Sequence, residues 1–211
     1  MPRTKLRLGV SACLLGRKVR YDGQHKRSAF LVEVLGPFVE WVEVCPEAEL
    51  GLGVPREPIR LVGRRAAPRL VAERTGKDLT DEMARFAEAR VRELGRLDLD
   101  GFVTKKDSPS CGLEKVRVHP ARGGRARRDG VGLFAAALAK QLPRLPIVEE
   151  SRLEDPTLRA RFVERILRYA GERPSSRPRR DLAGLRTQLL RRLRSLEDAV
   201  HDETESRLRG E

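Results

Sequence analysis

The sequence predicts an α/β fold of three layers: a mainly parallel, Rossmann-like sheet, with a small antiparallel insertion and a C-terminal helical extension. Two observations lead to this prediction. Short apolar runs typical of strands alternate with segments whose apolar residues recur every three or four positions, as amphipathic helices require. In addition, glycine and proline separate these segments. A chain of 211 residues, 39% of them hydrophobic, is long enough for one full core and an appendage.

In the first part of the chain, alternating apolar residues predict a strand over 5–12. A run rich in valine and aromatic residues predicts a second strand over 38–44. Between the two strands we expect a tight turn at Asp22-Gly23, followed by a helix over 26–35 that ends at Gly36-Pro37.

The middle of the chain predicts the antiparallel insertion, formed by two short strands over 58–63 and 69–73. Thr80 is expected to cap a helix that continues to about Gly95, because two acidic residues in its first turn suit the helix dipole. A third strand of the main sheet is expected over 97–104.

The next stretch begins with the basic, glycine-containing segment 121–128, which predicts a mobile surface loop. A mostly apolar helix is expected to begin near Gly130 and to end at Pro143. A short strand over 145–148 and a helix that starts at Asp155-Pro156 complete the predicted domain.

The domain boundaries follow from a change in composition. Residues 173–180 are rich in arginine, proline and serine and predict a linker between an α/β domain over 1–172 and an amphipathic helix over 181–211. Such a helix cannot bury its leucine stripe alone. It is expected to pack on the body, to pair with a second copy in a homodimer, or to contact RNA.

Composition also indicates the compartment and the type of partner. No apolar run approaches the roughly 18 residues of a membrane span, and no signal peptide pattern is present, so we expect a soluble, cytoplasmic protein without membrane contact. The net charge of +13 is unevenly distributed: residues 115–128 contain six Lys/Arg and no acid. Clustered positive charge favours a polyanionic partner such as tRNA. The alternative is a chain that is basic everywhere.

The three cysteines, Cys13, Cys45 and Cys111, share one local setting. Each follows a predicted strand, and each is followed within three residues by glycine or proline. Because the carboxyl ends of parallel strands meet at one edge of a sheet, the three thiols could meet there. In a reducing compartment, sparse cysteines are more often catalytic or metal-bound than disulfide-linked. Burial in the core is the alternative for each of them.

Two kinds of metal site remain open at this point. Structural zinc takes four ligands, often from paired Cys-x-x-Cys motifs, which are absent; His25 and His119 are the possible fourth ligands. Iron–sulfur clusters accept widely spaced thiolates, and three thiolates would leave one iron of a four-iron cluster open to a substrate. Glu47 and Ser108 lie close to two of the cysteines and could activate water and transfer protons. Alternatively, Glu47 caps the following segment and Ser108 starts a turn.

Four motifs, in this order, resemble the family of domain of unknown function 523, which includes the iron–sulfur desulfidases that act on thiouracil. The motifs are Ser11-Ala12-Cys13-Leu14-Leu15-Gly16, Val19-Arg20-Tyr21-Asp22-Gly23-x-x-Lys26, Cys45-Pro46-Glu47 and Ser108-Pro109-Ser110-Cys111-Gly112. The resemblance covers about residues 5–170. Longer members continue into a second domain, domain of unknown function 1722, linked with sulfur removal from 4-thiouridine in tRNA. Here that domain is expected to be absent or replaced by the C-terminal helix.

The resemblance implies a [4Fe-4S] cluster held by Cys13, Cys45 and Cys111, with one open iron that takes the sulfur of a thiocarbonyl. It implies that Glu47 activates water or transfers protons and that Ser108 assists protonation. Other residues of the motifs are expected to bind substrate: Arg20, Tyr21, Asp22, Lys26 and Ser110. Lys105 and Lys106 are expected to face it as positive charges.

The expected function is therefore that of an iron–sulfur-dependent desulfidase. It would convert thiopyrimidines (thiouracil or 4-thiouridine, also within tRNA) to the oxo form and release sulfide. The alternative is a basic RNA-binding module with a structural metal or buried cysteines and no catalysis. Positive charge near Cys13 and Cys111 favours nucleotide or tRNA substrates.

Overall fold

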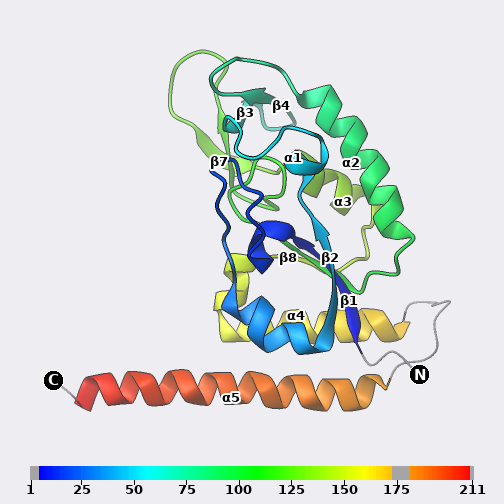
Figure 1. Cartoon of the computed structure of the whole chain (residues 1–211), viewed down its shortest axis with the longest axis vertical. Coiled ribbons are helices and arrows are strands. Elements are labelled where there is room, and N and C mark those ends of the chain that lie inside the picture. The colour runs from blue at the N-terminus through cyan, green and yellow to red at the C-terminus, as the bar shows by residue number, and fades with distance from the viewer. Residues whose placement is uncertain (1–4, 173–180, 210–211) are drawn as a thin grey trace.

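The computed structural model describes residues 5–172 and 181–209, which contain two four-stranded sheets (Figure 1). The first sheet has the order β2-β1-β5-β8, and all its neighbouring strands are parallel. Its strands are β1 (Leu6–Ser11), β2 (Val39–Val44), β5 (Gly101–Thr104) and β8 (Ile147–Glu149). Leu8 of the central β1 is in register with Trp41 of β2 and with Gly101 of β5. The predicted α/β fold with a parallel sheet is confirmed.

The second sheet has the order β4-β3-β6-β7 and is mixed. Its strands are β3 (Ile59–Arg64), β4 (Ala67–Ala72), β6 (Val116–His119) and β7 (Arg127–Gly130). The antiparallel β3–β4 pair is the insertion that the sequence predicts. The prediction of a loop over 121–128 is wrong at its end, where β7 begins. The sequence of β7 lacks alternating apolar residues, and the strand forms because its backbone pairs with β6.

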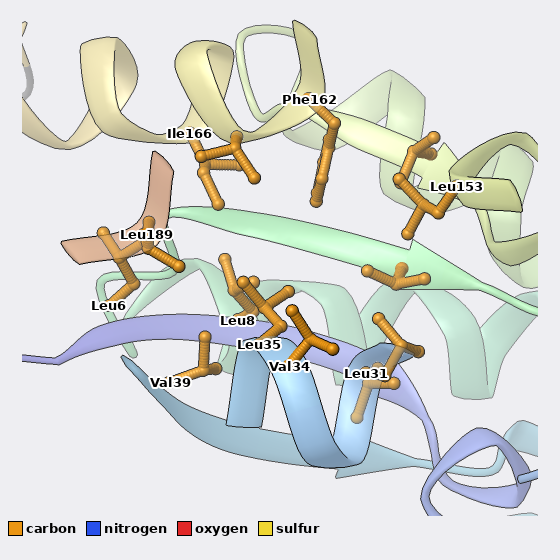
Figure 2. Close-up of a cluster of buried hydrophobic side chains, with 14 of the residues drawn as sticks. Leu6, Leu8, Leu31, Val34, Leu35, Val39, Leu153, Phe162, Ile166 and Leu189 are labelled. Atoms are coloured by element: carbon orange, nitrogen blue, oxygen red, sulfur yellow. The ribbon is translucent and has the colours of Figure 1, made fainter. Parts of the chain in front are cut away.

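Helices cover both faces of the parallel sheet and complete the three layers. On one face lie α2 (Thr80–Gly95) and α3 (Leu133–Gln141), where Phe102 of β5 and Phe134 of α3 have ring centroids 6.0 Å apart. The other face packs against α4 (Pro156–Glu172) and the six-residue π-helix η2 (Phe30–Leu35). Figure 2 shows Leu6 and Leu8 of β1 between Val34 and Leu35 of η2 and Ile166 of α4.

The remaining helical elements are short: η1 (Ala12–Leu15), η3 (Gly36–Phe38), α1 (Pro46–Glu49) and η4 (Glu150–Glu154). The expected helix over 26–35 is confirmed only in its second half, as η2. Before it, the amides of Lys26 and Ser28 donate to the carbonyls of Cys13 and Leu14, 2.9 Å away in each case. These bonds hold the segment extended against η1, so it cannot form a helical turn there.

The cap expected at Thr80 is also wrong. Leu79 occupies the cap position of α2, and Thr80 is the first helical residue. The Thr80 hydroxyl instead accepts the amide hydrogen of Leu70 in β4, at 2.8 Å. Its role is therefore to connect the helix to the second sheet.

The C-terminal helix α5 (Leu182–Arg209) lies along α4 and packs on the body (Figure 1). Leu185, Leu189 and Leu193 are at most 5% exposed and belong to the core cluster around β1. Arg186 forms an ion pair of 2.8 Å with Glu164 of α4. Of the three alternatives for the leucine stripe, packing on the body is observed. The linker predicted over 173–180 lies outside the described residues.

Within the described parts of the chain, no helix combines the length and the apolar character needed to cross a membrane.

Candidate functional site

The carboxyl ends of three neighbouring strands of the parallel sheet open into one pocket. Cys13 follows β1, Cys45 follows β2, and Cys111 lies on the loop after β5; these strands are adjacent in the sheet. All three cysteines line the same cavity of about 590 Å³, and residues of β3 and β6 in the second sheet form its opposite wall. The fold thus brings together three residues that are widely separated in the sequence.

The three thiols are free, and their burial disfavours the charged thiolate form. Burial and, after it, the neighbouring Cys45 raise the pKa of Cys13 to about 11, although Lys105 and Arg20 act in the opposite direction. Burial likewise raises the pKa of Cys45, and it raises the pKa of the buried Cys111 well above its ordinary value. A bound cationic group would remove this penalty, because metals bind the deprotonated thiol.

The arrangement favours a cluster over a single ion. In the described residues, no group of three or more histidine, cysteine or acidic side chains is placed to hold one ion. Zinc needs its sulfur ligands about 2.3 Å from one centre, whereas iron–sulfur clusters accept widely spaced thiolates. Of the two possible fourth zinc ligands, His25 is exposed and outside the pocket, and its ring nitrogen accepts the amide hydrogen of Arg27. His119 lines the pocket from β6. Soft thiolates are the ligands of iron–sulfur clusters.

Glu47 lies in the first turn of α1, and its carboxylate is held on both oxygens. Arg56 donates to Oε2 from Nη2 at 2.6 Å and from Nε at 3.0 Å. The Ser110 hydroxyl donates to Oε1 at 2.9 Å. The Glu47 side chain is 12% exposed and lines the pocket. Its position inside the helix shows that it does not cap α1, whose cap position belongs to Cys45.

Ser108 lines the pocket close to Cys111, and it starts a turn as one of its two sequence interpretations expects. Its Oγ accepts the amide hydrogens of Cys111 at 3.0 Å and Ser110 at 3.3 Å, which forms a local turn. Because Oγ acts as the acceptor in both bonds, the hydroxyl hydrogen is available to the pocket.

The residues expected to bind substrate are divided by the structure. Arg20, Tyr21 and Lys26 line the pocket, and the Arg20 guanidinium lies 5.3 Å from the centre of the half-exposed Tyr21 ring. Asp22 is not on the lining and pairs with Arg20 at 3.0 Å. Ser110 is fully buried and contacts Glu47.

The two lysines after β5 differ. Lys105 lines the pocket and its ammonium group is paired with Glu150. Lys106 also lines it: its backbone amide donates to Glu150 at 2.7 Å, and its ammonium group has no ion pair among the described residues.

Sequence reasoning missed several cations of the pocket. Arg56 lies at the end of the segment Gly51-x-Gly53-Val54-Pro55-Arg56, which local pattern alone does not connect with Glu47. Arg60 and Arg117 enter from β3 and β6 of the second sheet. No local signal identifies them, because the contact of that sheet with the cysteine loops is a property of the tertiary fold.

Known proteins resemble this chain over most of its length. The family model described as 2-thiouracil desulfurase matches residues 8–150. The chain is 28% identical over 151 residues to the uncharacterized protein YbbK of Bacillus subtilis (strain 168). The aligned region covers 69% of this chain and 97% of YbbK. A solved structure, the [4Fe-4S]-dependent thiouracil desulfidase TudS, is similar with a TM-score of 0.56 and 32% identity, covering 71% of this chain and 94% of that one. The family match spans most of the sequence and includes all three cysteines, Glu47 and Ser108, so this chain belongs to the 2-thiouracil desulfurase family.

Proposed function

We propose that this protein is a desulfidase that replaces the sulfur of a thiopyrimidine with oxygen and releases sulfide. The observation that carries the proposal is the meeting of Cys13, Cys45 and Cys111 with Glu47 and Ser108 around one pocket, in a chain of this family. In the overall reaction, the oxygen of water bonds to the ring carbon and the carbon–sulfur bond breaks. Sulfur leaves with both water protons as hydrogen sulfide, so no external oxidant or reductant is needed.

We further propose that Cys13, Cys45 and Cys111 hold a [4Fe-4S] cluster with one iron that has no cysteine ligand. When bound, such a cluster supplies a positively charged, sulfur-binding iron. The three thiols would bind it as thiolates, which releases their protons in spite of the raised pKa values of the metal-free state. The soft sulfur ligands and their place around one cavity support this assignment.

Glu47 is proposed as the base that accepts a proton from water. A carboxylate has about four acceptor positions. Arg56 donates two hydrogen bonds to the carboxylate and Ser110 donates one, so three of these positions are occupied. One position therefore remains for a water molecule in the pocket. Ser108, whose hydroxyl hydrogen is available, is proposed to donate to the departing sulfur or to the ring nitrogen.

The charge of the pocket supports an anionic form of the substrate. Four cations on the lining have no carboxylate partner in the described residues: Lys26, Arg60, Lys106 and Arg117. Thiouracil itself carries no phosphate, whereas a nucleotide or a thiolated tRNA does. The half-exposed Tyr21 offers a ring on which a base can stack. We therefore favour nucleotide or tRNA substrates over the free base.

The test is anaerobic reconstitution of the full chain with iron and sulfide, followed by sulfide release assays with thiouracil, 4-thiouridine and thiolated tRNA. We expect a brown protein with about four iron atoms per chain and sulfide release from at least one substrate. A colourless protein that retains one zinc per chain and releases no sulfide would contradict the proposal.

A second candidate is RNA binding without catalysis. The arginine-rich stretch formed by the connection between β6 and β7, with Arg122 and Arg125, and by the start of β7, with Arg127 and Arg128, favours it. It predicts tight, salt-sensitive tRNA binding that persists when the cysteines are replaced. It leaves unexplained why Cys45 and Glu47 line a cavity.

A further inference from the structure

Arg56 makes contacts that extend beyond a surface ion pair. Its side chain is 5% exposed, and its guanidinium makes four hydrogen bonds. Two of them go to Glu47 Oε2. The other two go from Nη1 to the carbonyls of Val19, at 3.0 Å, and Gly53, at 2.9 Å. Four bonds from one planar group fix its orientation, and a nearly buried charge pair with this geometry is costly to break.

The partners of Arg56 lie on three separate parts of the pocket wall. Glu47 belongs to α1, and Gly53 belongs to the loop after it. Val19 belongs to the segment that presents Arg20 and Tyr21, and its carbonyl also accepts the thiol hydrogen of Cys45 at 3.7 Å. The Arg56 amide donates to the carbonyl of Tyr21 at 2.9 Å. Arg56 therefore connects the Glu47 carboxylate with the segment that carries two of the proposed substrate residues.

We propose that Arg56 is a positioning residue that aims the Glu47 carboxylate into the pocket. Its two bonds fix Oε2, and the Ser110 bond fixes Oε1, so the carboxylate plane cannot rotate and its remaining acceptor position keeps one direction. This inference rests on the desulfidase function proposed above. Because a base works only within hydrogen-bond reach of its proton, a carboxylate that rotates freely loses turnover while substrate binding is kept.

A second arginine–glutamate pair provides a control. Arg17 also makes two bonds to one carboxylate, from Nε at 2.7 Å and Nη2 at 2.9 Å to Glu43. That pair is exposed and does not line the pocket. Arg17→Gln therefore removes a two-bond arginine–carboxylate pair, as Arg56→Gln does, without touching Glu47.

The experiment uses the anaerobically reconstituted full chain and compares the wild type with Arg56→Gln, Arg56→Lys and Arg17→Gln. For Arg56→Gln we expect about a 100-fold loss in kcat, with KM within about 3-fold of the wild type and unchanged iron content. Arg56→Lys keeps the positive charge but cannot donate two bonds from one planar group, so we expect a smaller loss in kcat than for Arg56→Gln. Arg17→Gln stays within about 2-fold of the wild type.

A double-mutant cycle decides whether Arg56 acts through Glu47. In a Glu47→Gln background, Arg56→Gln is expected to reduce kcat by less than about 3-fold, since the group that it positions is already gone. A full further loss in that background, loss of iron from Arg56→Gln and Arg56→Lys, or equal kcat in Arg56→Gln and Arg17→Gln would each overturn the proposal. If Arg56→Gln does not fold, the double-mutant cycle with Glu47→Gln is measured with Arg56→Lys instead.

A second readout does not depend on turnover. Glu47 in the reconstituted protein is labelled with a carbodiimide and an amine, and the labelled peptide is quantified by mass spectrometry. We expect several-fold faster labelling of Glu47 in Arg56→Gln and no change in Arg17→Gln; equal rates would overturn the proposal. If the wild type releases no sulfide from any thiopyrimidine, the proposed function fails, and the labelling rates alone then decide whether Arg56 holds Glu47.

Discussion

Ser110 donates its hydroxyl hydrogen to Glu47 across 2.9 Å, although the two residues are 63 positions apart in the chain. The bond joins the loop of Cys111 to the helix that follows Cys45. It places a fully buried hydroxyl beneath the carboxylate that we propose as the base. The loops of two proposed cluster ligands are thus coupled through a proposed catalytic residue.

Ser110→Ala removes this donor and leaves one Glu47 oxygen without its partner. We expect about a 10-fold loss in kcat, because a hydrogen bond to a charged group contributes about 1.5–3 kcal/mol. Iron content should be unchanged, since the substitution leaves all three thiols in place. Steady-state kinetics and iron analysis of the reconstituted variant check both expectations. A variant with the kinetics of the wild type would show that this bond does not serve the reaction.

Substrate charge is tested at Arg117, which lines the pocket without a carboxylate partner among the described residues. For Arg117→Gln we expect KM to rise about 10-fold for a phosphate-bearing thiopyrimidine, since one phosphate contact is lost. KM for free thiouracil should not change. Arg122→Gln, on the connection after β6 and outside the pocket lining, is the control. Equal changes of KM for the charged and the neutral substrate would contradict a phosphate contact.

The docking of α5 is tested at Leu189, which is 1% exposed in the core cluster. Leu189→Ala should lower the free energy of unfolding by about 2–5 kcal/mol, as truncation of buried leucines does. The exposed Arg192 on the same helix provides the control, because Arg192→Ala should change the free energy of unfolding by about 0.5 kcal/mol or less. Denaturant unfolding of both variants measures the difference. Equal stabilities would show that α5 does not dock in solution.

A pH dependence is expected from Glu149, at the end of β8. Burial raises the pKa of this carboxyl above its ordinary value, although the amides of Leu113 and Glu114 donate to it. A group with a raised pKa in the folded state contributes most stability at low pH and loses that contribution as the pH rises through the folded-state value. Glu149→Gln keeps an acceptor for the amides but does not titrate.

We therefore expect the stability of Glu149→Gln, relative to the wild type, to increase as the pH rises above the ordinary pKa of a glutamate, about 4.3. Denaturant unfolding at several pH values measures this difference. A difference that stays constant with pH would contradict the inferred cost of the buried charge.

The sequence predicts well that the three cysteines meet at one edge of the parallel sheet, because the pattern around each cysteine is local. A strand followed by a loop cysteine can be recognised three times, and parallel strands place those loops together without further information. The helix expected over 26–35 is longer than the observed η2. A helical pattern does not reveal that the amides of Lys26 and Ser28 bond to the backbone of η1. The strand β7 was missed because its pairing with β6, and not its own side chains, creates it.

Arg56, Arg60 and Arg117 could not be assigned to the pocket from sequence for a related reason. Each is one arginine in a chain with 44 basic residues, and only tertiary contacts distinguish it from the others. Ser110 was expected to meet the substrate because it lies beside Cys111. The structure places its hydroxyl on Glu47 instead.

The central claim is that Cys13, Cys45 and Cys111 hold the iron–sulfur cluster that desulfuration needs. The most direct measurement compares iron content and sulfide release from 4-thiouridine, thiouracil and thiolated tRNA in the reconstituted wild type and in Cys111→Ser. We predict about four irons and sulfide release for the wild type, and loss of both in Cys111→Ser with its circular dichroism kept. Full iron content and full activity in Cys111→Ser would contradict the account.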